Sequence, residues 1–410
     1  MNLYKLVTFT LFLFLAGGFF FLFFCRSENF QHDKILSVLS EDTTISVKIS
    51  YPEKWIKKDK IIIWSMPPSE NDFLPDSIAD EKQTLWIAPV LRMKLLEAGY
   101  VNIEYIGRDK SIIYNEQEYK TRDSHSKAID LENLLFFLSK DKQLKGKKIL
   151  LIGHSEGCDI NSMVAYKKDF NISALVNLAS NALSGEETAK YQQEFIFKKI
   201  FLPLGYKYPR HQEFMDSSLN KASSLDSYHT ANLDGIRQFD EENFAPIEAF
   251  IHQFEDNDSI YFHINSFLHE RWTRENQETK DLYKNDYKQY YNHFSSQITP
   301  AQIALRKSNP ENFYPSIKCP VLFVHGTADE QIDCYPNLKR MEYFMAKAEN
   351  KKFEKIILEG YNHGLSKGSD GQGYIPHPEN EEYIISVSSS PNLHIEDCVI
   401  ESILKWIGNQ

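Results

Sequence analysis

The chain has 410 residues and a formal net charge of −11, with 42% hydrophobic and 25% charged residues. These values are ordinary for a globular protein, and the length allows one large domain with an insertion. The acidic balance argues against a nucleic-acid partner. We find no fixed-period repeat and no long low-complexity tract.

The first residues form an apolar run from Leu6 to Phe24. The run is long enough to cross a hydrocarbon core, whereas the apolar part of a signal peptide is usually about 7–15 residues and ends in small residues. Here the small residues at 16–18 are followed by more phenylalanine, so cleavage would leave an apolar stub. We therefore predict a membrane anchor over residues 1–26, followed by a polar linker at 27–44.

The charges that flank this apolar run orient it only weakly, with Lys5 before it and Arg26 after it. We expect the rest of the chain to be anchored at the membrane and to lie outside the cytoplasm, in the periplasm or at the cell surface. Secretion after signal cleavage is the alternative.

The five cysteines form no CxxC pair and have no zinc-like spacing. We predict neither a metal site nor a cofactor from them. Small buried hydrophobic residues are the simplest interpretation, and a disulfide outside the cytoplasm stays open.

Strands and helices alternate after the linker. Helical patterns lie at 85–99, at 125–140 and after Gly157, and apolar runs predict strands at 44–52, 60–66, 101–107, 147–153, 172–180, 320–326 and 354–360. Short continuous apolar strands that alternate with helices indicate a parallel sheet covered on both faces. The predicted fold class is α/β, with a doubly wound and mostly parallel sheet.

One region breaks this alternation. Residues 182–311 contain helix-like stretches, many aromatic residues and no convincing strand. We interpret the region as a helical insertion, or cap, between the predicted strands at 172–180 and 320–326, within a core formed by 45–181 and 312–410. Its aromatic residues either form the core of the cap or roof an apolar pocket.

The sequence Gly153-His154-Ser155-Glu156-Gly157 matches the G-x-S-x-G pattern. The pattern alone is weak, but here it follows a predicted strand and precedes a predicted helix, as a nucleophile elbow requires. The glycines allow a strained turn at the serine and a close approach to neighbouring elements. Ser155 is therefore a candidate nucleophile, with an ordinary glycine-rich loop as the alternative.

A nucleophilic serine needs a base, and the base needs a carboxylate to orient it. Asp329 follows the strand at 320–326, and His363 follows the strand at 354–360, which is the chain order expected for this architecture. Asp333 and Glu330 are alternative acids.

Four other histidines are less suitable as the base. His377 and His394 lie in less ordered sequence, and His154 is part of the elbow itself. His325 ends a strand, where we expect it to pack.

The sequence resembles the α/β-hydrolase superfamily, in particular bacterial serine hydrolases with a helical cap between the sixth and seventh strands. The segments "IGHSEG", "PVLFVHGTADEQID" and "EGYNHG" carry the resemblance, which covers about 45–181 and 312–408. It implies the α/β-hydrolase fold, a triad of Ser155, His363 and Asp329, and hydrolysis through an acyl-enzyme.

One segment departs from the family pattern. The family usually has His-Gly after the third strand, where this chain reads "WSMPP" from Trp64. Because proline has no N–H, the donors in this loop are limited to Ser65 or Met66. We assign the oxyanion hole to the N–H groups of Met66 and Glu156. Trp64 is alternatively a residue that narrows the acyl pocket.

The resemblance and the ordered triad together predict a serine hydrolase that cleaves a small-molecule or acyl substrate at a carboxylic ester or thioester. A serine peptidase of the prolyl or aminopeptidase type shares the fold and triad and is the alternative. A noncatalytic binding scaffold is the third possibility. The sequence predicts no cofactor and leaves the oligomeric state open.

Overall fold

A computed structural model describes residues 31–410 except 42, 54–57, 67–86, 107–123, 197–244, 255–256, 296–297, 299, 330 and 369–392. The predicted anchor at 1–26 lies outside these residues. Among the helices that the structure does describe, none has the length and apolar character needed to span a bilayer.

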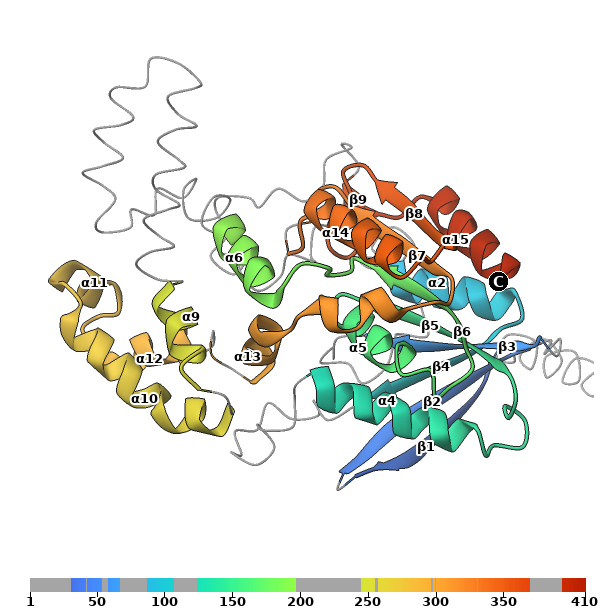
Figure 1. Ribbon diagram of the computed structural model, residues 1–410, viewed down its shortest axis with the longest axis horizontal. Coiled ribbons are helices and arrows are strands. Elements are labelled where there is room, and N and C mark those ends of the chain that lie inside the picture. Colours follow the sequence, from blue (N-terminus) through green and yellow to red (C-terminus); the bar gives the residue numbers. More distant parts are fainter. Residues whose placement is uncertain are drawn as a thin grey trace, which may run out of the picture.

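The core is an eight-stranded sheet in the order β1-β2-β4-β3-β5-β6-β7-β8 (Figure 1). β2 runs antiparallel to both of its neighbours, and the remaining adjacent pairs are parallel. The strands are β1 (Gln31–Ser40), β2 (Thr43–Pro52), β3 (Lys60–Ser65), β4 (Val101–Ile106), β5 (Lys148–His154), β6 (Ile172–Leu178), β7 (Val321–Gly326) and β8 (Phe353–Leu358). This is the α/β-hydrolase fold, and the predicted α/β sheet is mostly parallel as expected.

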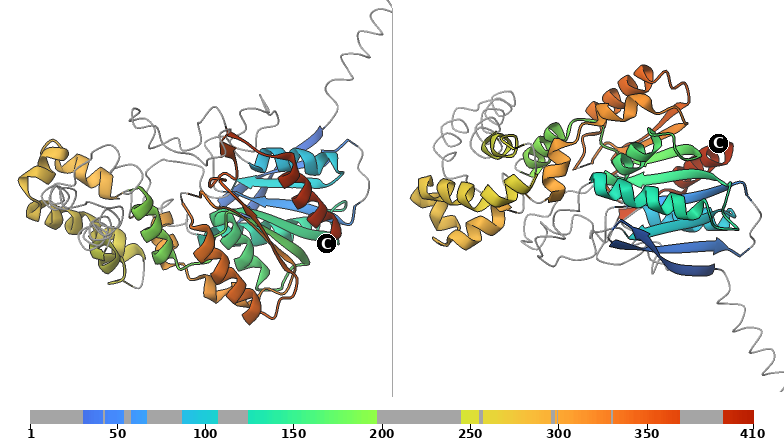
Figure 2. Two further views of the ribbon diagram at one scale, coloured as in Figure 1. Left: turned by 90° about the horizontal axis from the view of Figure 1, so that it is seen from above. Right: turned by 60° about the horizontal axis from the view of Figure 1, so that its bottom comes forward.

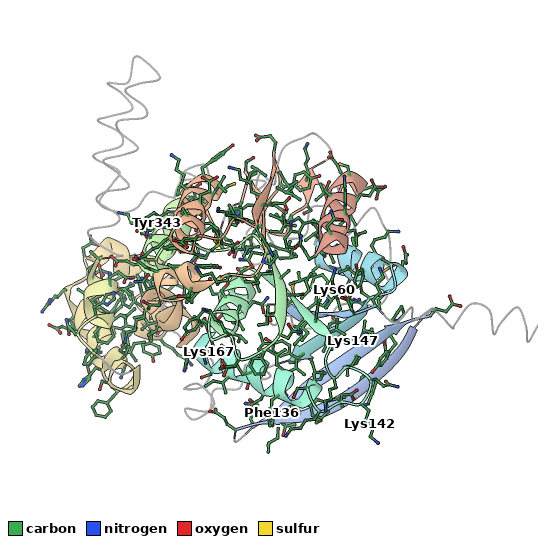
Figure 3. The ribbon with its side chains drawn as sticks, turned by 45° about the vertical axis from the view of Figure 1, so that its right-hand side comes forward. Lys60, Phe136, Lys142, Lys147, Lys167 and Tyr343 are labelled. Carbon is green, nitrogen blue, oxygen red and sulfur yellow. The ribbon has the colours of Figure 1, made fainter. Side chains whose placement is uncertain are left out.

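Helices cover both faces of this sheet (Figure 2). The core on one face includes α4 (Ser124–Leu138), α5 (Glu156–Ala165) and α14 (Cys334–Lys347), and the core on the other includes α2 (Ile87–Glu97) and α15 (Asp397–Asn409). Successive strand residues alternate between the two cores, so both strand faces are apolar, which explains the continuous apolar runs. Phe136 on α4 and Tyr343 on α14 lie on the outer side of their layer and are exposed (Figure 3).

The predicted linker at 27–44 is wrong over most of its length. Its described residues form β1, which pairs with β2 from Gln31↔Pro52 to Ser40↔Thr43. Val38 and Ser40 are buried, but Ile35 and Leu39 on the other side of the strand are exposed. Because apolar residues occur on both sides of an edge strand, the alternation that identifies a half-buried strand is blurred in the sequence.

The chain between β6 and β7 contains only helices among the described residues. They are α6 (Gly185–Ile196), α9 (Ala245–Ile251), α10 (Asn257–Arg274), α11 (Gln277–Leu282), α12 (Tyr287–Ser295) and α13 (Pro300–Lys307), followed by the short 3-10 turns η5 (Pro310–Asn312) and η6 (Tyr314–Ser316). Helices α9 to α13 extend to one side of the sheet (Figure 1). They contain a separate hydrophobic cluster that includes Phe250, Tyr290 and Phe294. Of the two roles predicted for the aromatic residues of the insertion, these three therefore have the first, which is to form its own core.

Candidate active site

Ser155 occupies a sharp turn between β5 and α5. Its backbone has φ 54° and ψ −125°, a region that residues with a side chain rarely adopt. The turn is held in place because the Ser155 N–H donates to the Leu178 carbonyl at 2.9 Å, and the Ser155 carbonyl accepts from the Cys158 N–H at 3.0 Å. A strained serine fixed between a strand and a helix is the geometry of a nucleophile elbow.

The two glycines of the motif are required by close contacts between backbones. A Cβ added at Gly153 would lie 2.6 Å from the Cys158 nitrogen, and one added at Gly157 would lie 1.9 Å from the Ser65 carbonyl oxygen. Backbone atoms cannot move aside as the end of a flexible side chain can. The close approach that the sequence predicts for these glycines is therefore present.

We expect Gly157→Ala to destabilise the protein by about 1–3 kcal/mol, because the added methyl group must push α5 away from the end of β3. Gly408→Ala is the matched control, since a Cβ at this position in α15 meets nothing within 4 Å. Alanine is favoured over glycine inside a helix, so the control variant should be as stable as the unmodified chain or slightly more so. Chemical unfolding measures the free energy of unfolding of both variants. Equal values for Gly157→Ala and Gly408→Ala would contradict the close contact between Gly157 and the Ser65 carbonyl.

Asp329 and His363 are brought together from the loops that follow β7 and β8. The His363 Nδ1–H group donates to the Asp329 carboxylate, with Nδ1 2.9 Å from Oδ2 and 3.0 Å from Oδ1. Both side chains are buried. Gly326 allows the two loops to meet, because a Cβ there would lie 2.1 Å from the Tyr361 carbonyl oxygen.

Further donors surround the Asp329 carboxylate. Oδ1 accepts the N–H groups of Gln331 and Ile332, both at 2.8 Å. Burial alone raises the pKa of Asp329, but the neighbouring His363 and the hydrogen bonds from His325 and His363 outweigh it, so the pKa lies well below its usual value. Asp329 is therefore ionised at neutral pH, as a residue that orients an imidazole must be.

His154 places the His363 ring beside the elbow. The His154 Nε2–H group donates to the His363 carbonyl at 2.8 Å, and the two ring centroids are 4.8 Å apart. His154 directly precedes Ser155, so the histidine of the acid–histidine pair packs against the residue next to the candidate nucleophile. Of the histidines considered as bases, His325 also lies here, whereas His377 falls outside the described residues.

The pKa of His154 is lowered to about 3, mainly by burial and further by His363. Between about pH 6.5 and pH 3 the unfolded chain binds a proton at His154 that the folded protein does not. Stability is therefore lost as pH falls through this range, with a slope of up to about 1.4 kcal/mol per pH unit from this residue. Urea unfolding measures the free energy of unfolding from pH 6 to pH 4. We expect this free energy to fall less steeply with decreasing pH for His154→Gln than for the unmodified protein. Parallel curves for the two proteins would refute the buried neutral histidine.

The predicted oxyanion donors lie close to the elbow. Glu156 is the first residue of α5, and a Cβ added at Gly157 would lie 3.4 Å from the Met66 nitrogen. Neither the Glu156 nor the Met66 N–H group donates to another described residue. The N-terminus of α5 also favours negative charge. The two prolines after Met66 lie outside the described residues.

Trp64 packs into the core of the sheet. Its side chain is buried among apolar residues on the α2 side of the sheet, and its Nε1–H donates to Asn102 Oδ1 at 2.8 Å. Ser65 points to the other side, where its Oγ donates to Asn161 Oδ1 at 2.6 Å. Because Asn161 belongs to α5, this bond fixes the end of β3 to the nucleophile helix.

Several contacts around the site were not predicted from the sequence. The Glu156 carboxylate accepts from Ser124 Oγ at 2.6 Å and from Lys127 Nζ at 2.9 Å, which ties the elbow to α4. Tyr191 of α6 donates its hydroxyl to the Asp329 carbonyl at 2.8 Å. The partners are far apart in sequence, and no local pattern marks them.

The alternative acids are not in the place of Asp329. Asp333 is the N-cap residue of α14 and makes no capping hydrogen bond through its side chain. Glu330 lies outside the described residues. The hydrogen bonds to His363 therefore favour Asp329 as the acid.

One group of described residues has metal-ligand geometry, namely Glu186, Glu248 and His252 in the insertion. Glu248 already pairs with the buried guanidinium of Arg306. Burial lowers the pKa of Arg306 only to about 10, so the arginine stays charged at neutral pH and opposes a cation. Cys158, Cys319, Cys334 and Cys398 are free thiols.

No family model matches the sequence, and no curated protein matches it either. Similar solved structures include an esterase from Pyrococcus furiosus, with 14% identity, coverage of 81% of this chain and 83% of that chain, and a TM-score of 0.42. The esterase Est1E from Butyrivibrio proteoclasticus has 11% identity, coverage of 91% and 99%, and a TM-score of 0.41. The proline iminopeptidase from Mycobacterium smegmatis has 11% identity, coverage of 81% and 92%, and a TM-score of 0.44.

Likenesses at this level decide neither the reaction nor the substrate, so the assignment depends on the chain itself. The strand order with its antiparallel β2 is one feature. The strained turn at Ser155 and the pair formed by Asp329 and His363 on the loops after β7 and β8 are the others. By these features the protein has the α/β-hydrolase fold.

Proposed function

We propose that the protein is a serine hydrolase that cleaves a carboxylic ester or thioester through an acyl-enzyme. The observation that carries this proposal is the strained Ser155 turn beside a buried His363 that donates to an ionised Asp329. The three residues come from separate loops, which follow β5, β7 and β8 at the same edge of the sheet.

In the proposed reaction, His363 takes the proton from the Ser155 hydroxyl as Oγ bonds to the substrate carbonyl carbon. The N–H groups of Glu156 and Met66 stabilise the oxyanion. His363 then gives its proton to the departing alcohol or thiol, and the acyl-enzyme forms. Next, His363 activates a water molecule, which releases the acid and returns the proton to Ser155.

We also propose that the helical insertion is a cap that bounds the substrate site. Tyr191 of α6 supports this assignment, because its hydroxyl bonds to the Asp329 carbonyl at 2.8 Å. The insertion therefore contacts the loop that carries the candidate acid. A cap in this position would select the acyl or alcohol part of a small-molecule substrate.

The proposed location is the membrane, with the hydrolase domain outside the cytoplasm. The support is the apolar run from Leu6 to Phe24, which is long enough to cross a bilayer. Membrane fractionation with protease protection of intact cells tests the location without any activity measurement.

The test of the hydrolase proposal is a fluorophosphonate probe applied to the full chain, followed by mass spectrometry of the labelled peptide. Labelling should map to Ser155. Turnover of p-nitrophenyl esters compared with X-Pro anilides then separates an esterase from a peptidase. A folded protein that neither takes the label nor turns over either substrate would be a binding scaffold, and the proposal would fail.

A further inference from the structure

A second histidine contacts the candidate catalytic carboxylate. His325 is the penultimate residue of β7, four residues before Asp329, and both side chains are fully buried. The His325 Nε2 atom is 3.1 Å from Asp329 Oδ2 and 3.0 Å from the Ile332 carbonyl oxygen. The reaction proposed above does not use this histidine.

The surroundings of His325 fix the position of its proton. The carbonyl and the ionised carboxylate only accept hydrogen bonds, so the Nε2 atom between them carries the hydrogen. His325 Nδ1 has no hydrogen-bond partner among the described residues, and the ring stacks on Phe323 with 5.2 Å between centroids. A second proton on Nδ1 would bury an unsatisfied donor together with a charge. The His325 hydrogen that faces the carboxylate is therefore on Nε2.

The backbone donors to Asp329 bind one carboxylate oxygen, whereas His363 Nδ1 lies within hydrogen-bond distance of both. The N–H groups of Gln331 and Ile332 hold Oδ1 at 2.8 Å each. These two bonds fix the position of one oxygen but leave the carboxylate able to pivot about it. Apart from His363, the described side-chain nitrogen beside Oδ2 is His325 Nε2, 3.1 Å away, and its hydrogen is shared with the Ile332 carbonyl at 3.0 Å. The contact from His325 therefore constrains the second carboxylate oxygen from a side other than that of the ring that the carboxylate must orient.

We propose that His325 is a positioning residue for the hydrolase reaction. Its Nε2–H group fixes the plane of the Asp329 carboxylate, and the carboxylate in turn fixes the orientation and tautomer of His363. This role rests on the proposed function. His325 itself contacts neither the substrate nor Ser155 in this role.

The test compares His325→Phe with His325→Gln in the full chain. Phenylalanine keeps the planar ring but removes the donor, whereas the glutamine amide can place an N–H group near the position of Nε2. For the phenylalanine variant we expect kcat to fall about 10- to 100-fold with KM unchanged, because a hydrogen bond to a charged group is lost. The glutamine variant should recover most of that loss. Full kcat with phenylalanine, or a glutamine variant that is folded but no better than phenylalanine, would overturn the role.

A measurement on the unmodified protein keeps the test valid if a variant does not fold. In ¹⁵N-histidine NMR spectra, His325 should carry a hydrogen on Nε2, and His363 should show a protected Nδ1–H proton. A His325 ring with no hydrogen on Nε2 would overturn the proposal without any variant.

The two proposals fail in different ways. If the protein is not labelled at Ser155 and shows no turnover, the hydrolase proposal is refuted, and the role of His325 in the reaction is refuted with it. If the protein is labelled and active but the His325→Phe variant keeps full kcat, only the role of His325 is refuted.

Discussion

Ser155→Ala is expected to lower kcat for ester hydrolysis by about 10⁶-fold and to abolish fluorophosphonate labelling. Alanine lacks the Oγ atom, so no acyl-enzyme can form, and the remaining groups can only assist direct attack by water. The substitution removes one oxygen and keeps the Cβ. The strained backbone at φ 54° should therefore be retained, and the thermal stability should change little.

The control for Ser155→Ala is Ser139→Ala. Ser139 is exposed at the end of α4, and its Oγ donates only to the Phe136 carbonyl. This variant should keep both labelling and turnover. If Ser155→Ala retains strong labelling, then another residue is the nucleophile, and the turn at Ser155 is an ordinary element of the fold.

The sheet was predictable because its central strands are buried on both faces. Strands such as β5 and β7 are continuous apolar runs that end at the elbow and at Gly326, and such runs are distinctive in a sequence. β1 was not predictable in this way. It is held by pairing with β2 over residues 31–40, and backbone pairing at a sheet edge requires no particular side chains.

The pairing of Asp329 with His363 was predictable for a related reason. Parallel strands place their carboxyl ends at one edge of the sheet, so residues just after those ends meet in space although they are far apart in the chain. The supporting contacts follow no such rule. Lys127 reaches Glu156 from the face of a helix, and nothing in the helical pattern distinguishes this lysine from an exposed one. The contact between His325 and Asp329 was easier to predict than that of Lys127, because the two residues are only four positions apart in the sequence.

Asp329→Asn is expected to lower kcat by about 10⁴-fold with little change in KM, because it should force His363 into the wrong tautomer. The Asp329 Oδ1 atom accepts two backbone N–H groups at 2.8 Å, and an amide nitrogen would clash with both donors. Asparagine must therefore place its oxygen there and its NH₂ group at the position of Oδ2. That nitrogen would face His363 Nδ1 and the Nε2–H group of His325.

With an N–H donor at the position of Oδ2, a hydrogen that stays on His363 Nδ1 would have to donate to the remaining oxygen, at the 3.0 Å position of Oδ1. His363 keeps the shorter of its two contacts, at 2.9 Å, only by accepting at Nδ1, which moves its own hydrogen to Nε2. The ring nitrogen that should take the Ser155 proton is then already protonated, and the base is lost although the shape of the site is kept. Asp333→Asn is the matched control, since the Asp333 side chain makes no capping hydrogen bond to α14, and its kcat should be unchanged. Steady-state kinetics with a p-nitrophenyl ester measures both variants. An Asp329→Asn enzyme within tenfold of full activity would show that the buried carboxylate is structural and that His363 is oriented by other contacts.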